Sequence, residues 1–470
     1  MKKCIGLLLI SLLLSSCKDN QTNTANYFQS IKNNPSELRM FLQAMPKGGD
    51  LHNHLDGAVF AENFIDDANN QTAEKDPIAY DSLIDSFSTR DYKIKQEPGD
   101  TQFFSTFAKF GSIDTYPKML VDVLPTNARQ HVDYLELMLV PNLPDVLGVA
   151  KDIPWTTNFK LLTDELNQAG MSEIIKKDSQ LLDQMTSYSQ QQFGCGSKNP
   201  QPECNITVRY QFATLRNFPR VDVFAQLLES FEAANQDPRV VGINIVQQEN
   251  EPLSMHDYDL HMQMIGYLHK LYPNVKISLH AGEMVLGQVP PDYLKDHINK
   301  AINIAGADRI GHGVDIASED HADALLDEMA KKHILVEINL TSNDVILGVH
   351  GKDHPIMLYL NHHVPIALST DDAGVLRTDL THEYQRAVET YNFDYFTLKN
   401  IDRNSLSYAF ISGKSLWKNN DTHVPVSACE YYGSDSCKKF LAGSEKAALQ
   451  YKLETQFAEF EKTYANRRVA

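Results

Sequence analysis

Two histidines, His52 and His54, stand two residues apart in an apolar stretch near the start of the chain. Side chains two residues apart on a β-strand point to the same face. The pair can therefore offer two imidazole nitrogens to one metal ion. Alone it is a weak signal, because the chain has 17 histidines and such pairs are commonly structural. A metal site requires further ligands elsewhere in the chain.

Side chains of suitable chemistry end three later apolar runs. They are His280, Glu283, His312, Asp371 and Asp372. Three histidines with one carboxylate can bind a metal ion and leave a position open for water, and zinc suits such ligands. Water on that ion has a pKa near ~7 and is a nucleophile at neutral pH, while the remaining groups can move protons. The set predicts a metal-dependent hydrolase, although each group alone would be better explained as structural.

The apolar runs that carry these residues alternate with helical patterns. Eight are expected to be strands: Gly48–Asp56, Val132–Leu139, Val208–Arg216, Val240–Val246, Lys276–Glu283, Arg309–Gly313, Leu335–Asn343 and Pro365–Asp372. Near-continuous hydrophobic runs are typical of parallel sheets, and the alternation implies right-handed crossovers. Eight repeats predict a (β/α)8 TIM barrel, with a doubly wound open sheet as the alternative. The barrel is favoured because the polar residues gather at the carboxyl ends of strands, where barrel enzymes have their active sites.

Other segments are expected around this barrel. The predicted helices are a lead-in over Tyr27–Met45 that is interrupted at Asn34-Pro35, then Phe224–Ala234, Tyr258–Leu271, Ala322–Lys332, and a final helix from Ser444 to about Ala465. Two loop insertions are expected, the polar and partly helical Asn69–Asp100 and the Gln, Gly, Pro and Cys-rich Ser187–Asn205. The apolar stripe of the final helix is expected to pack on the barrel rather than on a partner.

The N-terminus predicts export. A basic start precedes the apolar run Ile5–Leu14, whose length of about ten residues is too short for a bilayer, which takes roughly 20. The run ends in Leu14-Ser15-Ser16-Cys17, which resembles the lipobox of bacterial lipoproteins. An ordinary cleaved signal with a chance cysteine is the alternative. We expect a periplasmic or outer-membrane lipoprotein whose lipid on Cys17 is its only membrane contact, because several acyl chains anchor stably.

The expected division of the chain follows from these features. Residues 1–17 would be the signal peptide, 18–25 a polar tether, 26–418 the barrel and 419–470 a C-terminal extension. Four cysteines remain after Cys4 and Cys17 are set aside, and they form two close pairs: Cys195 with Cys204, and Cys429 with Cys437. Three connectivities are possible. Local pairing is favoured in an oxidising compartment, and zinc ligation is disfavoured because there is no Cys-x-x-Cys.

The charge balance excludes one class of partner. The formal net charge is −18, whereas binding to nucleic acid requires clustered Lys and Arg. We therefore expect no nucleic-acid partner. A small neutral or cationic substrate fits better.

Four sequence blocks follow one another in a specific order. They are Met45-Pro46-Lys47-Gly48-Gly49-Asp50-Leu51-His52-Asn53-His54-Leu55-Asp56-Gly57, His280-Ala281-Gly282-Glu283, Arg309-Ile310-Gly311-His312-Gly313 and Ser369-Thr370-Asp371-Asp372. This set resembles the adenosine deaminase family of metal-dependent amidohydrolases, over about Tyr27 to Trp417. The lead-in helix and the export signal are more similar to its secreted adenosine deaminase-related growth factor branch. Further matches are Phe103–Phe110, Tyr134–Leu137 and Glu337–Asn343.

The resemblance implies a reaction and a metal. The chain would deaminate adenosine, or a close 6-aminopurine nucleoside, to the 6-oxo product (inosine for adenosine) and ammonia, in purine salvage. One zinc ion per chain would be held by His52, His54, His280 and Asp371.

The resemblance also implies roles for four further residues. Glu283 would protonate the purine ring nitrogen next to the carbon under attack. His312 would take the proton from the zinc-bound water and stabilise the hydroxide. Asp372 would orient that hydroxide, and Asp56 would hold a ribose hydroxyl.

One position departs from the family pattern. After the fourth strand the family shows Ala-Gly-Asp-Glu or Val-Gly-His-Glu, with the glycine amide against the purine. This chain has Val246-Gln247-Gln248-Glu249, so Gln247 stands at the glycine position and is expected to contact the substrate. Polar changes in a pocket can alter selectivity strongly. Adenine, a modified adenosine or another amide or amine therefore remain possible substrates, and a non-catalytic binding or signalling lipoprotein is the alternative from another class.

Overall fold

A computed structural model describes residues 19–67, 77–109 and 115–467. Eight parallel strands form one sheet in the order β1 to β8. The strands are β1 (Lys47–His54), β2 (Val132–Leu139), β3 (Thr207–Leu215), β4 (Val240–Val246), β5 (Lys276–Ala281), β6 (Arg309–His312), β7 (Leu335–Ile338) and β8 (Ile366–Leu368). The Asp371 N–H donates to the His52 carbonyl (2.9 Å), and the Asp371 carbonyl accepts from the His54 N–H (3.1 Å). These bonds join the end of β8 to β1, so the predicted TIM barrel is confirmed.

Strands β5, β6 and β8 end earlier than the sequence predicts. At the end of each strand the chain enters the left-handed region of backbone conformation, at Gly282 (φ +73°), His312 (φ +65°) and Asp371 (φ +58°). Such residues cannot continue an extended strand. The polar residues at these ends therefore stand on turns above the sheet.

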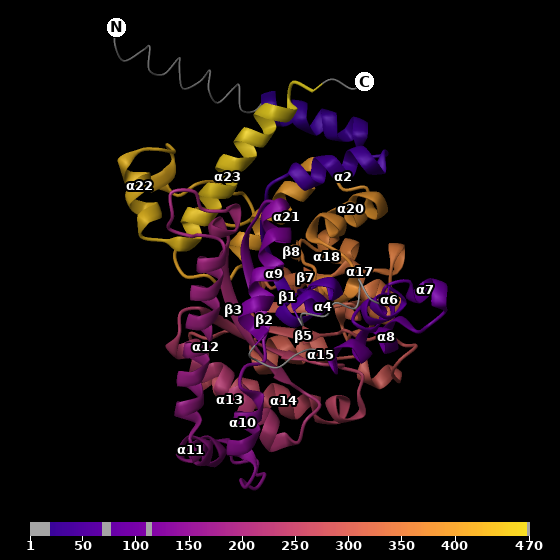
Figure 1. Cartoon of the computed structure of the whole chain (residues 1–470), viewed down its shortest axis with the longest axis vertical. Coiled ribbons are helices and arrows are strands. Elements are labelled where there is room, and N and C mark those ends of the chain that lie inside the picture. The colour runs from indigo at the N-terminus through magenta and orange to yellow at the C-terminus, as the bar shows by residue number, and fades with distance from the viewer. Residues whose placement is uncertain (1–18, 68–76, 110–114, 468–470) are drawn as a thin grey trace. The chain divides into compact units, whose positions relative to one another are not determined.

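Helices surround the strands and extend to both ends of the described chain. They are α2 (Pro35–Ala44), α3 (Leu55–Ala58), α4 (Ala61–Asp67), α6 (Pro77–Ser86), α7 (Tyr92–Lys95), α8 (Gly99–Phe107), α9 (Tyr116–Arg129), α10 (Leu143–Ala150), α11 (Phe159–Ala169), α12 (Met171–Gln192), α13 (Arg220–Gln236), α14 (Pro252–Leu271), α15 (His297–Lys300), α16 (Ala322–Lys332), α17 (Leu340–Leu347), α18 (Ile356–Asn361), α19 (Ala373–Leu376), α20 (Leu380–Tyr391), α21 (Tyr395–Ser407), α22 (Asp435–Ala442) and α23 (Glu445–Tyr464). Helix α13 packs on β3 and β4 and is flanked by α14 and α12 (Figure 1). Its residues from Val223 to Ala233 are therefore buried.

Both loop insertions contain more helix than the sequence predicts. The described part of the first insertion holds α6, α7 and the start of α8, while residues 69–76 lie outside the described residues. In the second, α12 continues to Gln192, and a loop closed by the Cys195–Cys204 disulfide follows. The other disulfide joins Cys429 to Cys437. Both local pairings are as predicted.

The chain forms two compact units. One contains the residues up to Gly49, Asn127–Tyr134 and the residues from Leu380 onward, and the other contains Asp50–Thr126 and Leu135–Asp379. The division runs through β1 and β2. In the first unit the ring of Phe41 lies 5.0 Å from that of Phe460 on α23. The final helix thus packs on the N-terminal helices of its own unit.

The start of the described chain differs from the expected tether. Residues 19–31 are helical, and the buried Thr24 hydroxyl donates to the Glu461 carbonyl (3.1 Å). Polar residues in this segment therefore belong to the packed helices of the first unit. The interruption at Asn34-Pro35 is confirmed, because the Asn34 side chain accepts from the backbone N–H groups of Ser36 and Glu37 and so begins α2. The lipobox residues, Cys17 included, lie outside the described residues.

Candidate active site

The four predicted metal ligands come together at the carboxyl end of the barrel. His52 and His54 lie on β1, His280 lies on β5, and Asp371 follows β8. The Asp371 Oδ1 atom lies 3.4 Å from His52 Nε2 and 3.3 Å from His54 Nε2. The Nε2 atoms of His54 and His280 are 3.3 Å apart. Segments distant in sequence therefore present four ligand atoms to one point.

The spacing of these atoms fits one metal ion. Ligand atoms about 2.0–2.1 Å from an ion at the centre of a tetrahedron lie about 3.3–3.4 Å from one another. The His52 side chain is fully buried, and its Nε2 atom has no hydrogen-bond partner in the described part of the chain. A buried nitrogen without a partner is costly. These residues form a metal site.

Carboxylates set the charge of this site. Burial lowers the pKa of His52, but the carboxylates of Asp371 and Glu337 next to its ring outweigh burial and raise the pKa to about 10. Burial favours protonation of Asp371, yet hydrogen bonds from His52 and His54 hold its pKa well below the ordinary value. Burial, and next the charge on His52, keep the pKa of His280 well below its ordinary value. The site thus favours a cation between the two carboxylates, beside a neutral imidazole.

The buried carboxylate of Glu337 orients the ring of His52. The His52 Nδ1 atom lies 2.7 Å from Glu337 Oε2, and Glu337 Oε1 lies 2.6 Å from Arg309 Nε. The Ser278 hydroxyl donates to the same Glu337 oxygen (2.8 Å). Because Nδ1 faces a carboxylate, Nε2 of His52 is the nitrogen that is directed to the metal site.

The same chain of hydrogen bonds continues around the interior of the barrel to His280. Arg309 donates to Glu136 (2.5 Å), which accepts from Gln211 Nε2 (2.9 Å). Gln211 Oε1 accepts from Asn244 Nδ2 (3.2 Å). Asn244 Oδ1 lies 2.9 Å from His280 Nδ1. All these side chains are buried. We call the set Glu337, Arg309, Glu136, Gln211 and Asn244 the polar ring; it connects two metal ligands through protein groups.

Three predicted proton-transfer groups stand beside the metal ligands. Burial, followed by the charges of Asp371 and Glu249, raises the pKa of Glu283 well above its ordinary value. Burial, followed by Asp371, does the same for the pKa of Asp372. Burial lowers the pKa of His312 to about 3. Burial thus favours the protonated form of these two carboxyl groups and the neutral form of the imidazole, which suits them to donate protons and hydrogen bonds.

Close packing fixes Asp372. A Cβ atom on Gly57 would lie 1.6 Å from Asp372 Oδ1, so only glycine fits there. Asp56, next to Gly57, has a pKa that burial raises. The two carboxyl groups and His54 lie close enough to interact directly. The His-x-His-x-Asp-Gly block therefore shapes the site through its glycine as well as through its ligands.

A cavity of about 670 Å³ opens onto these groups. Eight of the nine predicted site residues line it, and the ninth, His52, is fully buried. The titratable side chains among its described lining are His54, His280, His312, Asp56, Glu251, Glu283, Asp371 and Asp372. No Lys or Arg is among them.

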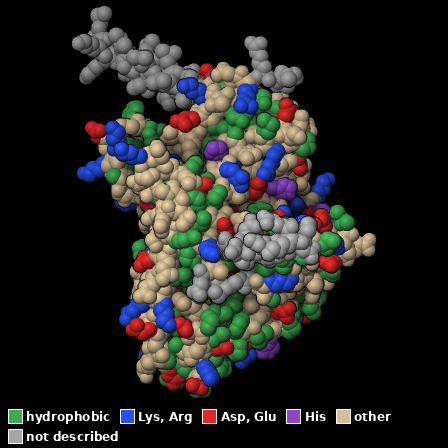
Figure 2. All heavy atoms as spheres, viewed as in Figure 1, with side chains coloured by type: hydrophobic (Ala, Val, Ile, Leu, Met, Phe, Trp, Pro, Cys, Tyr) green, Lys and Arg blue, Asp and Glu red, His purple; other side chains and the backbone are tan. Residues whose placement is uncertain are grey.

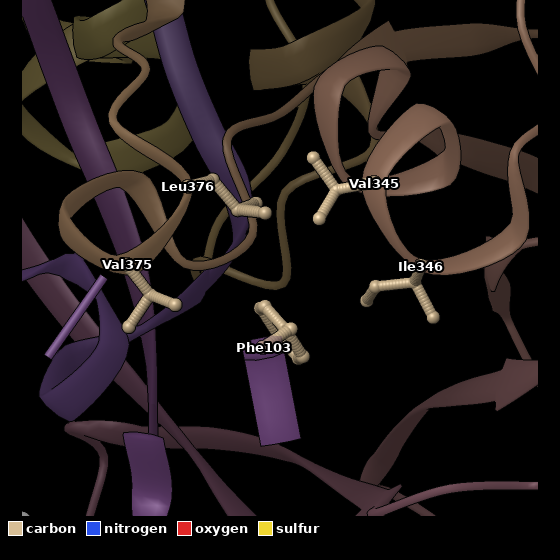
Figure 3. Packing of buried hydrophobic residues seen from close by; sticks show 5 residues of the cluster. All are labelled: Phe103, Val345, Ile346, Val375 and Leu376. Carbon is tan, nitrogen blue, oxygen red and sulfur yellow. The ribbon is translucent and has the colours of Figure 1, made fainter. Parts of the chain in front are cut away.

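One wall of the cavity is apolar. Phe103 of α8 packs against Val345 and Ile346 of α17 and Val375 and Leu376 of α19. Figure 3 shows these side chains directed toward one another. Phe103 and Ile346 also line the cavity. Apolar walls lower the local dielectric and so favour the protonated form of nearby carboxyl groups.

Gln247 adopts the backbone conformation of a glycine. Its φ is +77°, a region that costs a non-glycine residue about 1–2 kcal/mol. Its Oε1 accepts from the Asn217 N–H (2.9 Å), and Asn217 Nδ2 donates to the Gln248 carbonyl (3.0 Å). The side chain is therefore held against the turn after β3, while Gln247 still lines the cavity.

Comparison with known proteins agrees with this geometry. The family model described as adenosine deaminase matches residues 46–419. The chain belongs to the adenosine deaminase family. An adenosine deaminase from Clostridium perfringens is 33% identical over 138 residues, which are 29% of this chain and 38% of that protein. The chain thus aligns with less than half the length of that relative.

Two solved structures share the fold. One is a cog1816 amidohydrolase from Burkhoderia ambifaria with bound Zn, with a TM-score of 0.57, 19% identity and coverage of 91% of this chain and 95% of that chain. The other is the N6-methyl-AMP deaminase of Arabidopsis thaliana, with a TM-score of 0.55, 18% identity and coverage of 89% and 98%.

The sequence analysis did not identify the buried residues that hold the metal ligands and His312 in place. Glu136 and Glu337 each carry a charge in the middle of an apolar strand, which is a usable signal for a buried polar group. Asn244 and Gln211 offered no such signal. His354 was not among the predicted site residues either, and its Nε2 atom lies 3.0 Å from Asn343 Oδ1 in the buried interior.

The replacement Glu337→Gln tests the polar ring. It removes the charge that holds His52 Nδ1 and leaves Arg309 with one carboxylate fewer, so zinc affinity should fall about 10–100-fold. Competition with a chromophoric chelator measures that affinity. The exposed Glu430→Gln is the matched control and should bind as the unaltered protein does. Equal zinc affinity in both variants would contradict the role of Glu337.

Proposed function

We propose that this protein removes the 6-amino group of adenosine, or of a close 6-aminopurine nucleoside, by hydrolysis, giving the 6-oxo product and ammonia. The observation that carries the proposal is the buried Glu283 carboxyl in one cavity with the metal site. Displacing an amine from a purine requires a proton donor for the ring and a water-derived nucleophile. Purine salvage would follow from this reaction.

Zinc is the proposed metal. His52, His54, His280 and Asp371 would hold one ion per chain, and the spacing of their ligand atoms supports this. The zinc in the Burkholderia amidohydrolase supports the identity of the ion. When bound, zinc lowers the pKa of water and makes it a nucleophile at neutral pH.

The other residues would act on the substrate directly. Glu283 would protonate the ring nitrogen beside the carbon under attack, and burial supports this role because it raises the pKa of the carboxyl. Asp372 and His312 would orient the attacking water by hydrogen bonds. Asp56 would bind a ribose hydroxyl, and Gln247 would contact the base with the Nε2 group that remains when its Oε1 is bonded to Asn217.

The charge of the cavity favours a nucleoside over a nucleotide. The described lining has several carboxyl groups but no Lys or Arg. A phosphate dianion there would lose its hydration without gaining a basic side chain as counter-charge. On the face shown in Figure 2, basic and acidic side chains are interspersed, which gives no reason to expect a nucleic-acid substrate. A nucleoside monophosphate, the substrate class named for the Arabidopsis protein, therefore fits this chain poorly.

We also propose that the protein is exported and lipid-anchored, in keeping with the secreted branch of the family. Its two disulfides support an oxidising compartment. No helix in the described part of the chain is long and apolar enough to cross a membrane. The anchor would be the lipid on Cys17.

A substrate panel tests the reaction. We expect zinc-dependent release of ammonia from adenosine, at least about 100-fold lower kcat/KM for AMP because of the uncompensated phosphate, and weaker activity on free adenine. Turnover of adenine or of an N6-substituted adenosine above that of adenosine would redirect the substrate assignment. A loss of all turnover on 6-aminopurines would overturn the proposal.

The Glu283→Gln variant is the control for this panel. An amide cannot protonate the ring, so turnover should fall by at least about 10³-fold. Zinc content, measured by elemental analysis, should stay at one ion per chain. Full activity in this variant would remove Glu283 from the mechanism.

Gln247→Glu tests the contact with the base. Glutamate keeps an oxygen for the Asn217 N–H but loses the N–H donors, so KM for adenosine should rise about 3–10-fold, the worth of one hydrogen bond. The value of kcat should change little. Gln247→Gly separates the side chain from the backbone: it should raise KM to the same extent if the side chain makes the contact. An unchanged KM in both variants would assign the contact to the backbone alone.

Cys17→Ser tests the anchor. The variant should move from the detergent-extracted membrane fraction to the soluble fraction of the producing bacterium. Retention in the membrane would argue against a lipid on Cys17.

A further inference from the structure

The two ring nitrogens of His312 have different surroundings. Its Nδ1 atom lies 3.0 Å from Asn343 Nδ2. Its Nε2 atom has no hydrogen-bond partner in the described part of the chain and lies 4.0 Å from Asp371 Oδ2. His312 is fully buried. A neutral imidazole carries one proton, and the partner of Nδ1 decides which nitrogen holds it.

The orientation of the Asn343 amide follows from His354. The Ile356 backbone N–H donates to His354 Nδ1 (3.1 Å). A backbone N–H can only donate, so Nδ1 of His354 is unprotonated and its Nε2 carries the proton. That Nε2 lies 3.0 Å from Asn343 Oδ1, which therefore accepts. The amide nitrogen of Asn343 is then the atom that faces His312.

The hydrogen bonds that connect Ile356, His354, Asn343 and His312, which we call the relay, all run in one direction. Each step runs from an N–H to an acceptor: Ile356 to His354, His354 to Asn343, and Asn343 to His312. Because Nδ1 of His312 accepts, its ring proton resides on Nε2. Both Asn343 and His354 are buried, so water does not compete for these bonds.

Two other groups approach Nδ1 of His312 at longer distances. Asn339 Nδ2 lies 3.4 Å away and would also donate. Glu283 Oε1 lies 3.5 Å away and could accept a proton from Nδ1, which would favour the opposite tautomer. The shorter distance favours Asn343 as the partner of Nδ1.

We propose that Asn343 and His354 are positioning residues that fix His312 as its Nε2–H tautomer, so that His312 presents a hydrogen-bond donor to the cavity instead of a base. The family resemblance implied a proton-accepting His312. The hydrogen bonds of the relay are sufficient to assign the tautomer. The effect of the tautomer on turnover, in contrast, rests on the proposed deamination. A donor fixed at this point would stabilise an attacking oxygen as negative charge develops on it.

Asn343→Asp tests the relay with almost no change in volume. A carboxylate has no N–H, so it can accept from His354 and must accept from His312, which moves the ring proton of His312 to Nδ1. Two-bond ¹⁵N–¹H correlation spectra of histidine-labelled protein report which nitrogen is protonated, and a His312→Gln sample assigns the signal. We expect the Nε2–H pattern in the unaltered protein and the Nδ1–H pattern in N343D. An Nδ1–H pattern in the unaltered protein overturns the proposal.

Kinetics and two further variants complete the test. In N343D we expect kcat to fall about 10²–10³-fold, as for loss of one catalytic hydrogen-bond donor, with KM within about threefold. His354→Gln, whose amide can still donate to Asn343, should keep the Nε2–H pattern and most activity. The exposed Asn199→Asp adds the same charge at a distance and should change neither readout.

The failure of either proposal can be recognised separately. The spectra of the unaltered protein and of H354Q decide the tautomer even if N343D does not fold or no purine is deaminated. A reversed tautomer in N343D with unchanged kcat would show that His312 does not act as a donor in the reaction. It would leave the deamination itself in place.

Discussion

Two backbone hydrogen bonds hold together the part of the molecule on which its chemistry depends. They run between Asp371 and the end of β1, and they join the last strand of the barrel to the first. The same residues carry three of the four metal ligands. Closure of the barrel and assembly of the ligand set are therefore one structural event, and neither can be altered without the other. The left-handed backbone at Asp371 contributes, because it turns the carboxylate toward the imidazoles while its amide stays paired.

Below this closure the barrel interior holds charges where aliphatic layers are usual. Buried ions are costly unless each is paired and hydrogen-bonded. In the polar ring, Arg309 lies between the carboxylates of Glu136 and Glu337, and Glu337 also bonds to His52. The ring fixes the orientation of His52 and His280 from opposite sides. The low dielectric that makes the ring costly also strengthens each of its bonds.

The sequence predicted the barrel and the ligands for a common reason. Parallel strands bring their carboxyl ends to one edge, so polar residues that end separate strands must meet, as His280 and Asp371 do. Residues that act through contacts between strands were beyond such reasoning. Asn244 and Gln211 are ordinary amides in sequence, and only the register of neighbouring strands brings them together. His354 lies just before α18, and only the Ile356 N–H at the start of that helix gives its ring a direction. The left-handed residues were also missed, since Gln247 and His312 are not residue types that predict this conformation.

The high pKa of His52 affects how the protein takes up its metal ion. Without an ion, a proton on His52 supplies positive charge between Asp371 and Glu337. That proton therefore takes the place of the charge of the ion when the site holds no metal. Metal uptake then becomes an exchange in which a proton leaves as the ion enters, and it is favoured as the surroundings become less acidic.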